Sequence, residues 1–159
     1  MVGDCLGPSR TAAASEAEVM IVCGVDVMGE AARNLCPDKK VVALNMGAGC
    51  PMADMITGQA LAARKKEIPG VPVLTYVNSP AEAKAESDMC CTSANVVDKL
   101  RSFKSDTGLM TPDKNLAAYA QKQVPEKKVL FWEGYCPVHH RLSPEIVLDL
   151  KRSFPGAPV

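Results

Sequence analysis

Two of the seven cysteines in this chain, Cys50 and Cys136, lie in matching segments of the sequence, where each is preceded by a loop with glycine and followed directly by proline. A cysteine thiolate can bind a metal ion or an iron–sulfur cluster. Structural zinc usually takes its cysteines in close sequence pairs, and neither cysteine has a second one in its own segment. The wide spacing therefore favours an iron–sulfur cluster. The odd cysteine count excludes a complete disulfide framework, and the absence of a Cys-x-x-Cys pair disfavours a thiol redox protein.

An internal repeat accounts for this recurrence. Residues 37–41 match residues 125–129 at a shift of 88, and beyond a loop that is two residues shorter the match continues at a shift of 86. At the second shift the matched segments are Cys50-Pro51 with Cys136-Pro137, Thr57 with Ser143, residues 65–66 with 151–152, and residues 69–73 with 155–159. We therefore expect two similar units with equivalent cysteines. The second unit reaches residue 159 where the first begins a strand, which predicts a longer parent protein.

The elements that position these cysteines follow an α/β pattern, in which short β-branched runs alternate with helical stretches. Strands are expected at residues 19–23, 40–44, 72–77, 89–92, 108–110 and 128–132. Helices are expected near residues 7–17, 27–35, 57–67, 95–103, 115–122 and 143–153, and after Ser79. Ser79 and Ser143 are expected to cap the helices that follow them, with Glu82 completing a capping box at the first. Both Cys50 and Cys136 then lie just beyond a strand, where open α/β sheets place ligands.

The predicted fold class is α/β, with repeated three-layer αβα domains and mainly parallel sheets. The first domain is expected at residues 1–86, lacking its first strand, and the second at residues 87–159, lacking its last strand.

The composition is that of a folded globular protein. The 159 residues are 47% hydrophobic and 23% charged, and 18 basic residues balance 18 acidic ones. Without an excess of positive charge, nucleic acid is not an expected partner. No apolar run is long enough to span a membrane, and residues 1–4 lack the basic flank of a secretion signal. We therefore expect a cytoplasmic protein with neither a nucleic-acid nor a membrane partner.

Seven segments resemble the quinolinate synthase family. They are GVDVMGE (24–30), CPDKK (36–40), GCPMAD (49–54), YVN (76–78), CTSAN (91–95), PDKNL (112–116) and GYCPVH (134–139). The resemblance runs in register along nearly the whole chain and covers about half of a full family member. It implies a transferase of de novo NAD biosynthesis that condenses iminoaspartate with dihydroxyacetone phosphate to quinolinate, releasing phosphate and water. L-aspartate oxidase would be the supplier of iminoaspartate.

The resemblance also implies an architecture and a cofactor. Family members have three similar α/β domains around a pseudo-threefold axis, and each domain donates one cysteine to a [4Fe-4S] cluster. Cys50 and Cys136 would be two of these ligands, and the third domain would be absent from this chain. The iron without a protein ligand acts as a Lewis acid on substrate oxygens.

Other roles carry over position by position. Tyr76 and Asn78 resemble the family's substrate-contacting residues at a strand end, and His139 resembles its active-site histidine. Ser93 resembles a residue that binds substrate oxyanions, which the N–H groups at a helix start favour. Cys5 stands where the family usually has serine, and because a thiol is a weaker hydrogen-bond partner than a hydroxyl, we expect weaker substrate binding there.

Simpler interpretations remain open at each position. Either metal-binding cysteine alone could be a small buried apolar residue, Ser93 a plain helix cap, and His139 a solvated turn residue. The family's early histidine and tyrosine strand, its His-Pro-Glu-Cys motif and its active-site lysine lie outside this sequence, so we expect the chain alone to be inactive. The alternative function is a non-catalytic, cysteine-containing α/β module that binds a metal or cluster.

Overall fold

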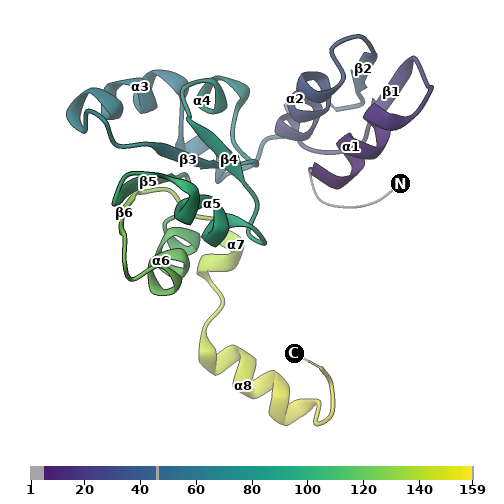
Figure 1. The fold of residues 1–159 in the computed structure, drawn as a ribbon. Coiled ribbons are helices and arrows are strands. Elements are labelled where there is room, and N and C mark those ends of the chain that lie inside the picture. Colours follow the sequence, from purple (N-terminus) through teal and green to yellow (C-terminus); the bar gives the residue numbers. More distant parts are fainter. Residues whose placement is uncertain (1–5, 46, 159) are drawn as a thin grey trace.

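A computed structural model describes residues 6–45 and 47–158 (Figure 1). The strands in these ranges are β1 (Val19–Val22), β2 (Lys40–Ala43), β3 (Val73–Tyr76), β4 (Met89–Cys91), β5 (Thr107–Thr111) and β6 (Lys128–Phe131). The helices are α1 (Leu6–Ala14), α2 (Asp26–Leu35), α3 (Gly58–Glu67), α4 (Ala81–Ala85), α5 (Val96–Ser102), α6 (Lys114–Gln123), α7 (Pro137–His140) and α8 (Pro144–Ser153), with a 3-10 helix η1 (Ala53–Met55). None of the helices in these ranges is long and apolar enough to cross a membrane.

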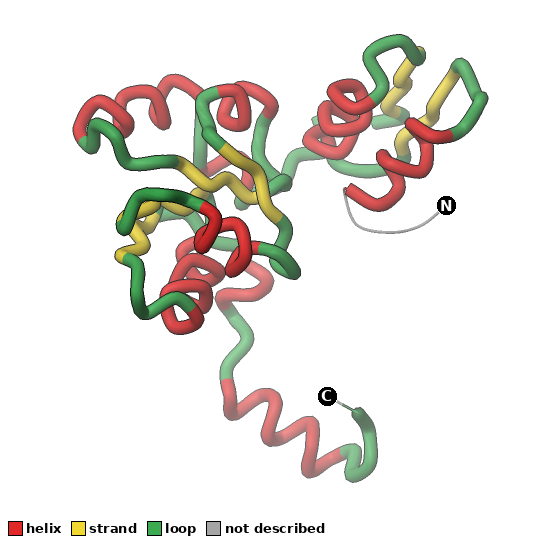
Figure 2. Tube along the Cα trace, viewed as in Figure 1, coloured by secondary structure: helices red, strands yellow, loops and turns green. Residues whose placement is uncertain are grey.

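Four strands form one parallel sheet in the order β4-β3-β5-β6. Helices cover both of its faces (Figure 2), and the alternation of side chains along the strands divides the core accordingly. On one face Leu74 and Met110 pack with residues of α5 and α6. On the other face Val73 and Leu109 pack with Leu61 of α3 and with α4. The predicted α/β class with parallel sheets and helices on both sides is confirmed.

The remaining strands, β1 and β2, form a separate parallel pair. Helices α1 and α2 pack together beside this pair and lie with it at one end of the molecule, while α8 projects at another (Figure 1). Val19 and Ile21 of β1 are exposed to solvent. This pair is therefore covered less completely than the four-stranded sheet.

The strand registers reproduce the sequence repeat. Val19 pairs with Lys40 in the first pair of strands, and Thr107 pairs with Lys128 in the second, so both partners are displaced by the same 88 residues. The lysine before each second strand also has the same role: Lys39 Nζ bonds the carbonyls of Ala12 and Ser15, and Lys127 Nζ bonds those of Phe103 and Ser105. The repeat is thus a repeat of structure and not only of turn residues.

The predicted domain boundary lies inside the four-stranded sheet. Strand β3 precedes residue 86 and strand β4 follows it, yet the two pair through Leu74 and Met89. The last strand of the first repeat has therefore joined the sheet of the second repeat. The division into domains at residues 1–86 and 87–159 stays a prediction, but it is not a division between sheets.

Helix capping follows the sequence at one site and departs from it at another. Ser143 caps α8 as predicted, since its hydroxyl accepts a hydrogen bond from the N–H of Ile146. At α4 the predicted capping box is wrong, because Ser79 makes no cap. A carboxylate oxygen of Glu30, from α2, instead accepts from the N–H of Ala81 over 2.7 Å. Glu82 is engaged with α3, accepting from the N–H of Gly58, and is thereby drawn away from the box.

Candidate functional site

Most of the predicted site residues lie beyond the carboxyl ends of strands in one parallel sheet. Tyr76 is the last residue of β3, and Asn78 follows it. Ser93 follows β4, and Cys136 and His139 follow β6. Because parallel strands end at the same edge of a sheet, this topology places all five positions along one edge.

The strand order creates a switch point at this edge. From β3 the chain crosses to β4 on one side and then returns past β3 to β5 on the other. Tyr76 ends β3 and Asp113 follows β5, so they flank the point where the connections diverge. Open α/β sheets bind ligands at such a switch point. Asp113 itself is buried and caps α6, accepting from the N–H groups of Asn115 and Leu116.

The segment that carries Cys50 is joined to the segment that carries Cys136. The carbonyl of Cys50 accepts a hydrogen bond from the N–H of Asp54 at the start of η1, which ends at Met55. The carbonyl of Met55 accepts from the indole N–H of Trp132, just after β6, over 2.9 Å. The backbone N–H of Tyr135, next to Cys136, contacts the sulfur of Met55 at 3.4 Å. Two cysteine-bearing segments from different repeats are therefore held together through Met55.

Gly134 allows this close approach. A Cβ atom at this position would lie 2.5 Å from the carbonyl oxygen of Pro112 and 3.3 Å from Cβ of Met55. The first distance is shorter than real Cβ contacts, so a side chain would force the loop after β6 away from Pro112, and the second would leave only a tight contact with Met55.

The two cysteines occupy equivalent backbone positions. The N–H of Asp26, at the start of α2, donates to the carbonyl of Ala48 over 2.8 Å, and the N–H of Lys114, at the start of α6, donates to the carbonyl of Gly134 over 2.8 Å. Each accepting carbonyl lies two residues before a cysteine. Cys50 and Cys136 are both unpaired thiols of intermediate exposure. Partly exposed, equivalent thiols on adjoining segments are suitable as ligands of a shared metal group.

The histidines after Cys136 have different surroundings. His139 lies in α7 with its side chain exposed. The ring of His140 lies 4.7 Å from that of Tyr135, and its Nδ1 lies 3.3 Å from the side-chain amide nitrogen of Asn115. Lys114 Nζ lies 5.1 Å from the centre of the Tyr135 ring. Sequence reasoning assigned no role to Lys114, Asn115, Tyr135 or His140, although the first three lie in segments that resemble the family.

Ser93 lies exposed in the tight turn between β4 and α5. The side chain of Asn95 closes this turn by accepting from the N–H of Thr92 over 2.8 Å, and Asn95 also occupies the N-cap position of α5. Asn95, and not Ser93, therefore occupies the cap position of α5, so the interpretation of Ser93 as a plain helix cap is wrong. Cys5, the other expected oxyanion contact, lies outside the described residues.

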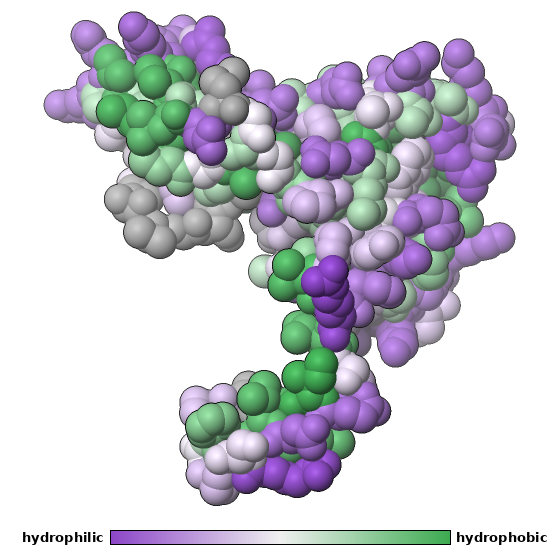
Figure 3. Space-filling model, turned by 180° about the vertical axis from the view of Figure 1, so that it is seen from behind, coloured by the Kyte–Doolittle hydropathy of each residue, from purple (hydrophilic) through white to green (hydrophobic). Residues whose placement is uncertain are grey.

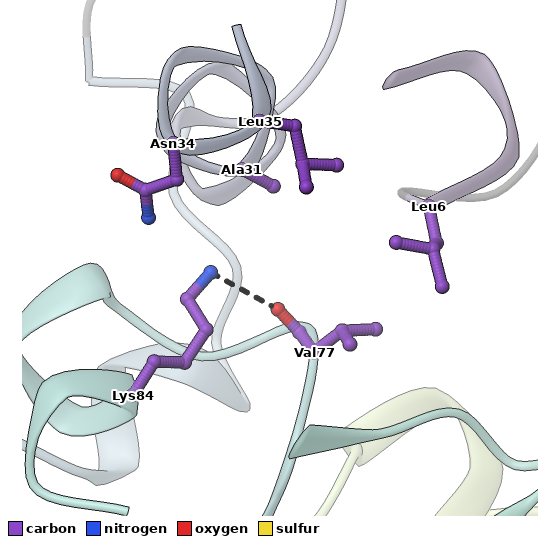
Figure 4. Close-up of a pocket in the computed structure, with 6 residues that line it drawn as sticks. All are labelled: Leu6, Ala31, Asn34, Leu35, Val77 and Lys84. Atoms are coloured by element: carbon purple, nitrogen blue, oxygen red, sulfur yellow. Dashed lines mark hydrogen bonds between the residues drawn. The ribbon is translucent and has the colours of Figure 1, made fainter. Parts of the chain in front are cut away.

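A small pocket lies beside the segment that carries Tyr76 and Asn78. It has a volume of about 140 Å³ and is lined by Leu6, Ala31, Asn34, Leu35, Val77 and Lys84 (Figure 4). Lys84 is the charged member of this lining, and its Nζ donates to the carbonyl of Val77 over 3.3 Å. The hydroxyl of the neighbouring Ser79 is buried and has no hydrogen-bond partner among the described residues. The sequence did not predict the positions of Lys84 and Ser79 at this pocket, because these positions depend on how α2 packs against β3 and α4.

Of the other described cysteines, Cys90 shares the intermediate exposure of this pair, but burial raises the pKa of its thiol. Cys36 and Cys91 are buried, as expected for small apolar residues, whereas Cys23 is exposed. Burial, and secondarily the neighbouring Cys90, raises the pKa of the Cys91 thiol to about 12. Among residues 6–45 and 47–158, no group of three or more His, Cys, Asp or Glu side chains is arranged to hold a metal ion. The described residues therefore offer two thiols, and not a complete ligand set.

Comparisons with known proteins agree with this arrangement. The family model described as quinolinate synthetase A protein (NadA) matches residues 1–159. A quinolinate synthase from Dehalococcoides mccartyi is 52% identical over 158 residues, covering 99% of this chain and 52% of the relative. Quinolinate synthases from a Geobacter species and from Methanosarcina barkeri are 49% and 47% identical, over 52% and 51% of their lengths. The chain spans about half the length of the curated relatives that it matches, and it belongs to the quinolinate synthase (NadA) family.

Proposed function

We propose that this chain forms part of a quinolinate synthase that condenses iminoaspartate with dihydroxyacetone phosphate to quinolinate, releasing one phosphate and two water molecules. With one phosphate and two water molecules released, the equation balances in every element, so no external oxidant is needed. L-aspartate oxidase is the proposed source of iminoaspartate. The family membership supports the proposed class of reaction, and the positions at the sheet edge support the proposed site residues.

One observation carries the assignment of residues. Met55 joins the Cys50 segment to the Cys136 segment, beside the sheet edge that also bears Tyr76 and Asn78. A cysteine that was only a small core residue would be expected to be buried, yet both thiols are partly exposed. The arrangement thus favours ligand thiols next to a substrate site over two independent packing residues.

We assign Cys50 and Cys136 as two ligands of a [4Fe-4S] cluster. When bound, such a cluster supplies a Lewis-acidic iron for substrate oxygens. Two thiols are fewer than a stable cluster needs, so we expect the chain alone to hold it weakly and to form no quinolinate.

The other side chains would bind substrate and move protons. The Tyr76 phenol and the Asn78 amide can both donate and accept hydrogen bonds, which suits the carboxylates and carbonyl of the two substrates. Ser93 presents a hydroxyl for an oxyanion from its turn. The imidazole of His139 can accept or donate a proton during the loss of water.

Thiol protection tests the ligand assignment. The chain is reconstituted anaerobically with ferrous iron and sulfide, treated briefly with iodoacetamide, and digested for mass spectrometry. We expect iodoacetamide labelling of Cys50 and Cys136 to be lower in the reconstituted protein than in protein that received no iron and sulfide. The exposed Cys23 should be labelled equally in both. Cys23→Ser is the matched control for Cys50→Ser and Cys136→Ser. Unchanged labelling of both proposed ligands, together with visible absorbance that persists in both serine variants, would refute the assignment.

The alternative function is a cysteine-containing α/β module that binds a metal or cluster without turnover. The two proposed functions can be distinguished in a chain that is extended to the length of its relatives. We expect the extended protein to form quinolinate from the two substrates and to lose this activity with Cys50→Ser or Cys136→Ser. An extended protein that binds a metal or cluster but forms no quinolinate would favour the alternative.

A further inference from the structure

The backbone on the strand side of Asn78 is held by two hydrogen bonds. Asn78 lies in the loop of residues 77–80, which joins β3 to α4. The N–H of Val77 donates to the carbonyl of Cys91 over 2.9 Å, and the carbonyl of Val77 accepts from Lys84 Nζ over 3.3 Å. Both polar groups of the Val77 backbone are therefore fixed, and the chain enters the loop in a defined direction.

On the helix side the loop has no comparable support from its own residues. Ser79 is completely buried, but its hydroxyl makes no hydrogen bond with the described residues. Pro80 has no N–H to donate. The support comes from α2, since a carboxylate oxygen of Glu30 accepts from the N–H of Ala81, the first residue of α4, over 2.7 Å. Residues 78–80 alone lie between this bond and the bonds on the strand side.

Helix α4 depends on its neighbours, because it has only five residues and a helix of this length is not stable in water by itself. It lies between α3 and α2 (Figure 1). Two bonds hold it to α3. The carboxylate of Glu82 accepts from the N–H of Gly58 over 3.1 Å, and Lys65 Nζ donates to the carbonyl of Glu86 over 2.6 Å. Glu30 holds the start of the helix to α2, on the side where the loop enters.

The repeat separates the role of Glu30 from the general construction of the fold. At the shift of 88, α2 corresponds to α6, and Glu30 corresponds to Ala118. Helix α6 packs on its strands without a carboxylate at this position. Helices α3, α6 and α8 are each capped by the residue directly before them, whereas the carboxylate at the start of α4 comes from 51 residues away. Glu30 therefore serves the junction with α4 and not its own helix.

The approach of α2 to this loop is partly polar. Figure 4 shows Asn34 of α2 on the side that faces Val77 and Lys84, across the pocket between them. The strongly hydrophobic exposed side chains gather elsewhere, on the β1–β2 pair and on α8 (Figure 3). A hydrogen bond from a backbone N–H to a charged carboxylate is stronger than one between neutral groups. The bond of Glu30 is therefore suited to fix the distance between α2 and the loop.

We propose that Glu30 is a positioning residue, whose carboxylate fixes the start of α4 so that Asn78 keeps its place at the substrate site. The inference rests on the proposed function, in which the Asn78 amide contacts substrate. Glu30 acts through the loop and touches no substrate itself. A displacement of about 1 Å in a positioned group can lower the rate about a hundredfold, so one bond at the end of a short loop can affect turnover.

Hydrogen exchange, followed by NMR, tests the hold on the loop in the chain as it is. Glu30→Ala removes the acceptor, and we expect the Ala81 amide to exchange at least about tenfold faster. Glu30→Gln keeps an acceptor oxygen and should retain most of the protection. Gln121→Ala is the matched control, because Gln121 accepts from the N–H of Val129 near the amino end of β6, away from the candidate site. It should leave the exchange of Ala81 unchanged.

Kinetics of the chain extended to the length of its relatives test the consequence for catalysis. We expect Glu30→Ala to lower kcat/KM about ten- to a hundredfold and Glu30→Gln to lower it by less than about threefold. In an Asn78→Ala background, Glu30→Ala should cause little further loss, because the loop then has no amide to position. Gln121→Ala should leave kcat/KM unchanged. Glu30→Asp keeps the charge but shortens the side chain, and it gives a milder effect in the same direction if Glu30→Ala does not fold.

The outcomes separate this role from the proposed function. Unchanged exchange of Ala81 in the Glu30→Ala protein would overturn the hold on the loop at any level of activity. Losses from Glu30→Ala and Asn78→Ala that combine in full would overturn the proposal as well, because Glu30 would then act by another route. An extended protein that forms no quinolinate even without a substitution would refute the proposed function, and the exchange of Ala81 would still decide whether Glu30 holds the loop.

Discussion

The indole N–H of Trp132 donates a hydrogen bond to the carbonyl oxygen of Met55 over 2.9 Å, across 77 residues of sequence. Trp132 directly follows β6, and Met55 ends the 3-10 helix that begins near Cys50. This bond connects the two cysteine-bearing segments without using either cysteine. It explains how a sheet edge from one repeat and a loop from the other can serve the same site.

Trp132→Phe tests this connection. The substitution keeps an aromatic ring but removes the donor, so the carbonyl of Met55 loses its partner. We expect the free energy of unfolding to fall by about 1–3 kcal/mol, as measured by urea denaturation. Tyr119→Phe on the exposed face of α6 is the control and should leave the free energy of unfolding unchanged. A Trp132→Phe protein as stable as the control would show that the bond does not hold the segments together.

Gly134→Ala tests the close packing of the same segments. An alanine Cβ would lie 2.5 Å from the Pro112 carbonyl, so the loop after β6 must move, at a cost of about 1–3 kcal/mol. Gly29→Ala in α2 is the matched control, because its Cβ would be no nearer than 4.0 Å to Ala43. There we expect no loss, and a gain of up to about 1 kcal/mol from helix propensity. Thermal unfolding of both variants gives the comparison, and equal melting temperatures would contradict the tight contact at Gly134.

Much of the local structure could be predicted from the sequence. The expected strand at residues 128–132 is found as Lys128–Phe131, and the expected helix at residues 143–153 as Pro144–Ser153. Such elements are encoded locally by hydrophobic periodicity and by caps such as Ser143. The repeat could also be recognised, because its turn residues and cysteines recur at a shift of 88 and, beyond a shorter loop, of 86 residues.

The sheet assignment of β3 could not be predicted. The repeat identifies which residues are equivalent, but not which repeat the last strand of a unit pairs with. That choice depends on packing between Val73 and Leu109, which are far apart in sequence. The contact of His140 with Asn115 was missed for the same reason, since it forms only when α6 and α7 meet. The sequence therefore predicts the positions at the sheet edge better than the neighbours of each position.

The pKa of Cys91 predicts a loss of stability in alkali. Burial raises this pKa to about 12 in the folded protein, from an ordinary value of 9.0. Between these values the unfolded chain releases the thiol proton and the folded protein retains it. Stability should therefore be unaffected by Cys91 below about pH 9 and should fall above it, by up to about 1.4 kcal/mol per pH unit.

Cys91→Ala isolates this contribution. We expect the loss of unfolding free energy between about pH 8 and about pH 10.5 to be smaller in the variant than in the unmodified chain, by about 1–2 kcal/mol. Urea denaturation under reducing conditions measures it. Cys23→Ala, at an exposed cysteine, should leave the pH dependence unchanged. Identical pH dependence in the Cys91→Ala protein would mean that Cys91 ionises in the folded state as readily as in the unfolded one.

The paired caps Thr57 and Ser143 should have different effects on global stability. Both accept a hydrogen bond from a backbone N–H three residues later, so Thr57→Ala and Ser143→Ala remove the same kind of local interaction. Helix α3 is anchored in the core by Leu61, which is fully buried, whereas no residue of α8 is buried. Loss of the first cap should therefore lower the global free energy of unfolding by about 1 kcal/mol.

Loss of the second cap should unfold α8 locally without destabilising the rest, because a ten-residue helix without packing is marginal in water. We expect Ser143→Ala to leave the urea midpoint unchanged and to abolish amide protection in residues 144–153. Hydrogen exchange with mass spectrometry resolves the two helices. If Ser143→Ala instead lowered the urea midpoint as much as Thr57→Ala does, α8 would have to be packed against the body of the chain.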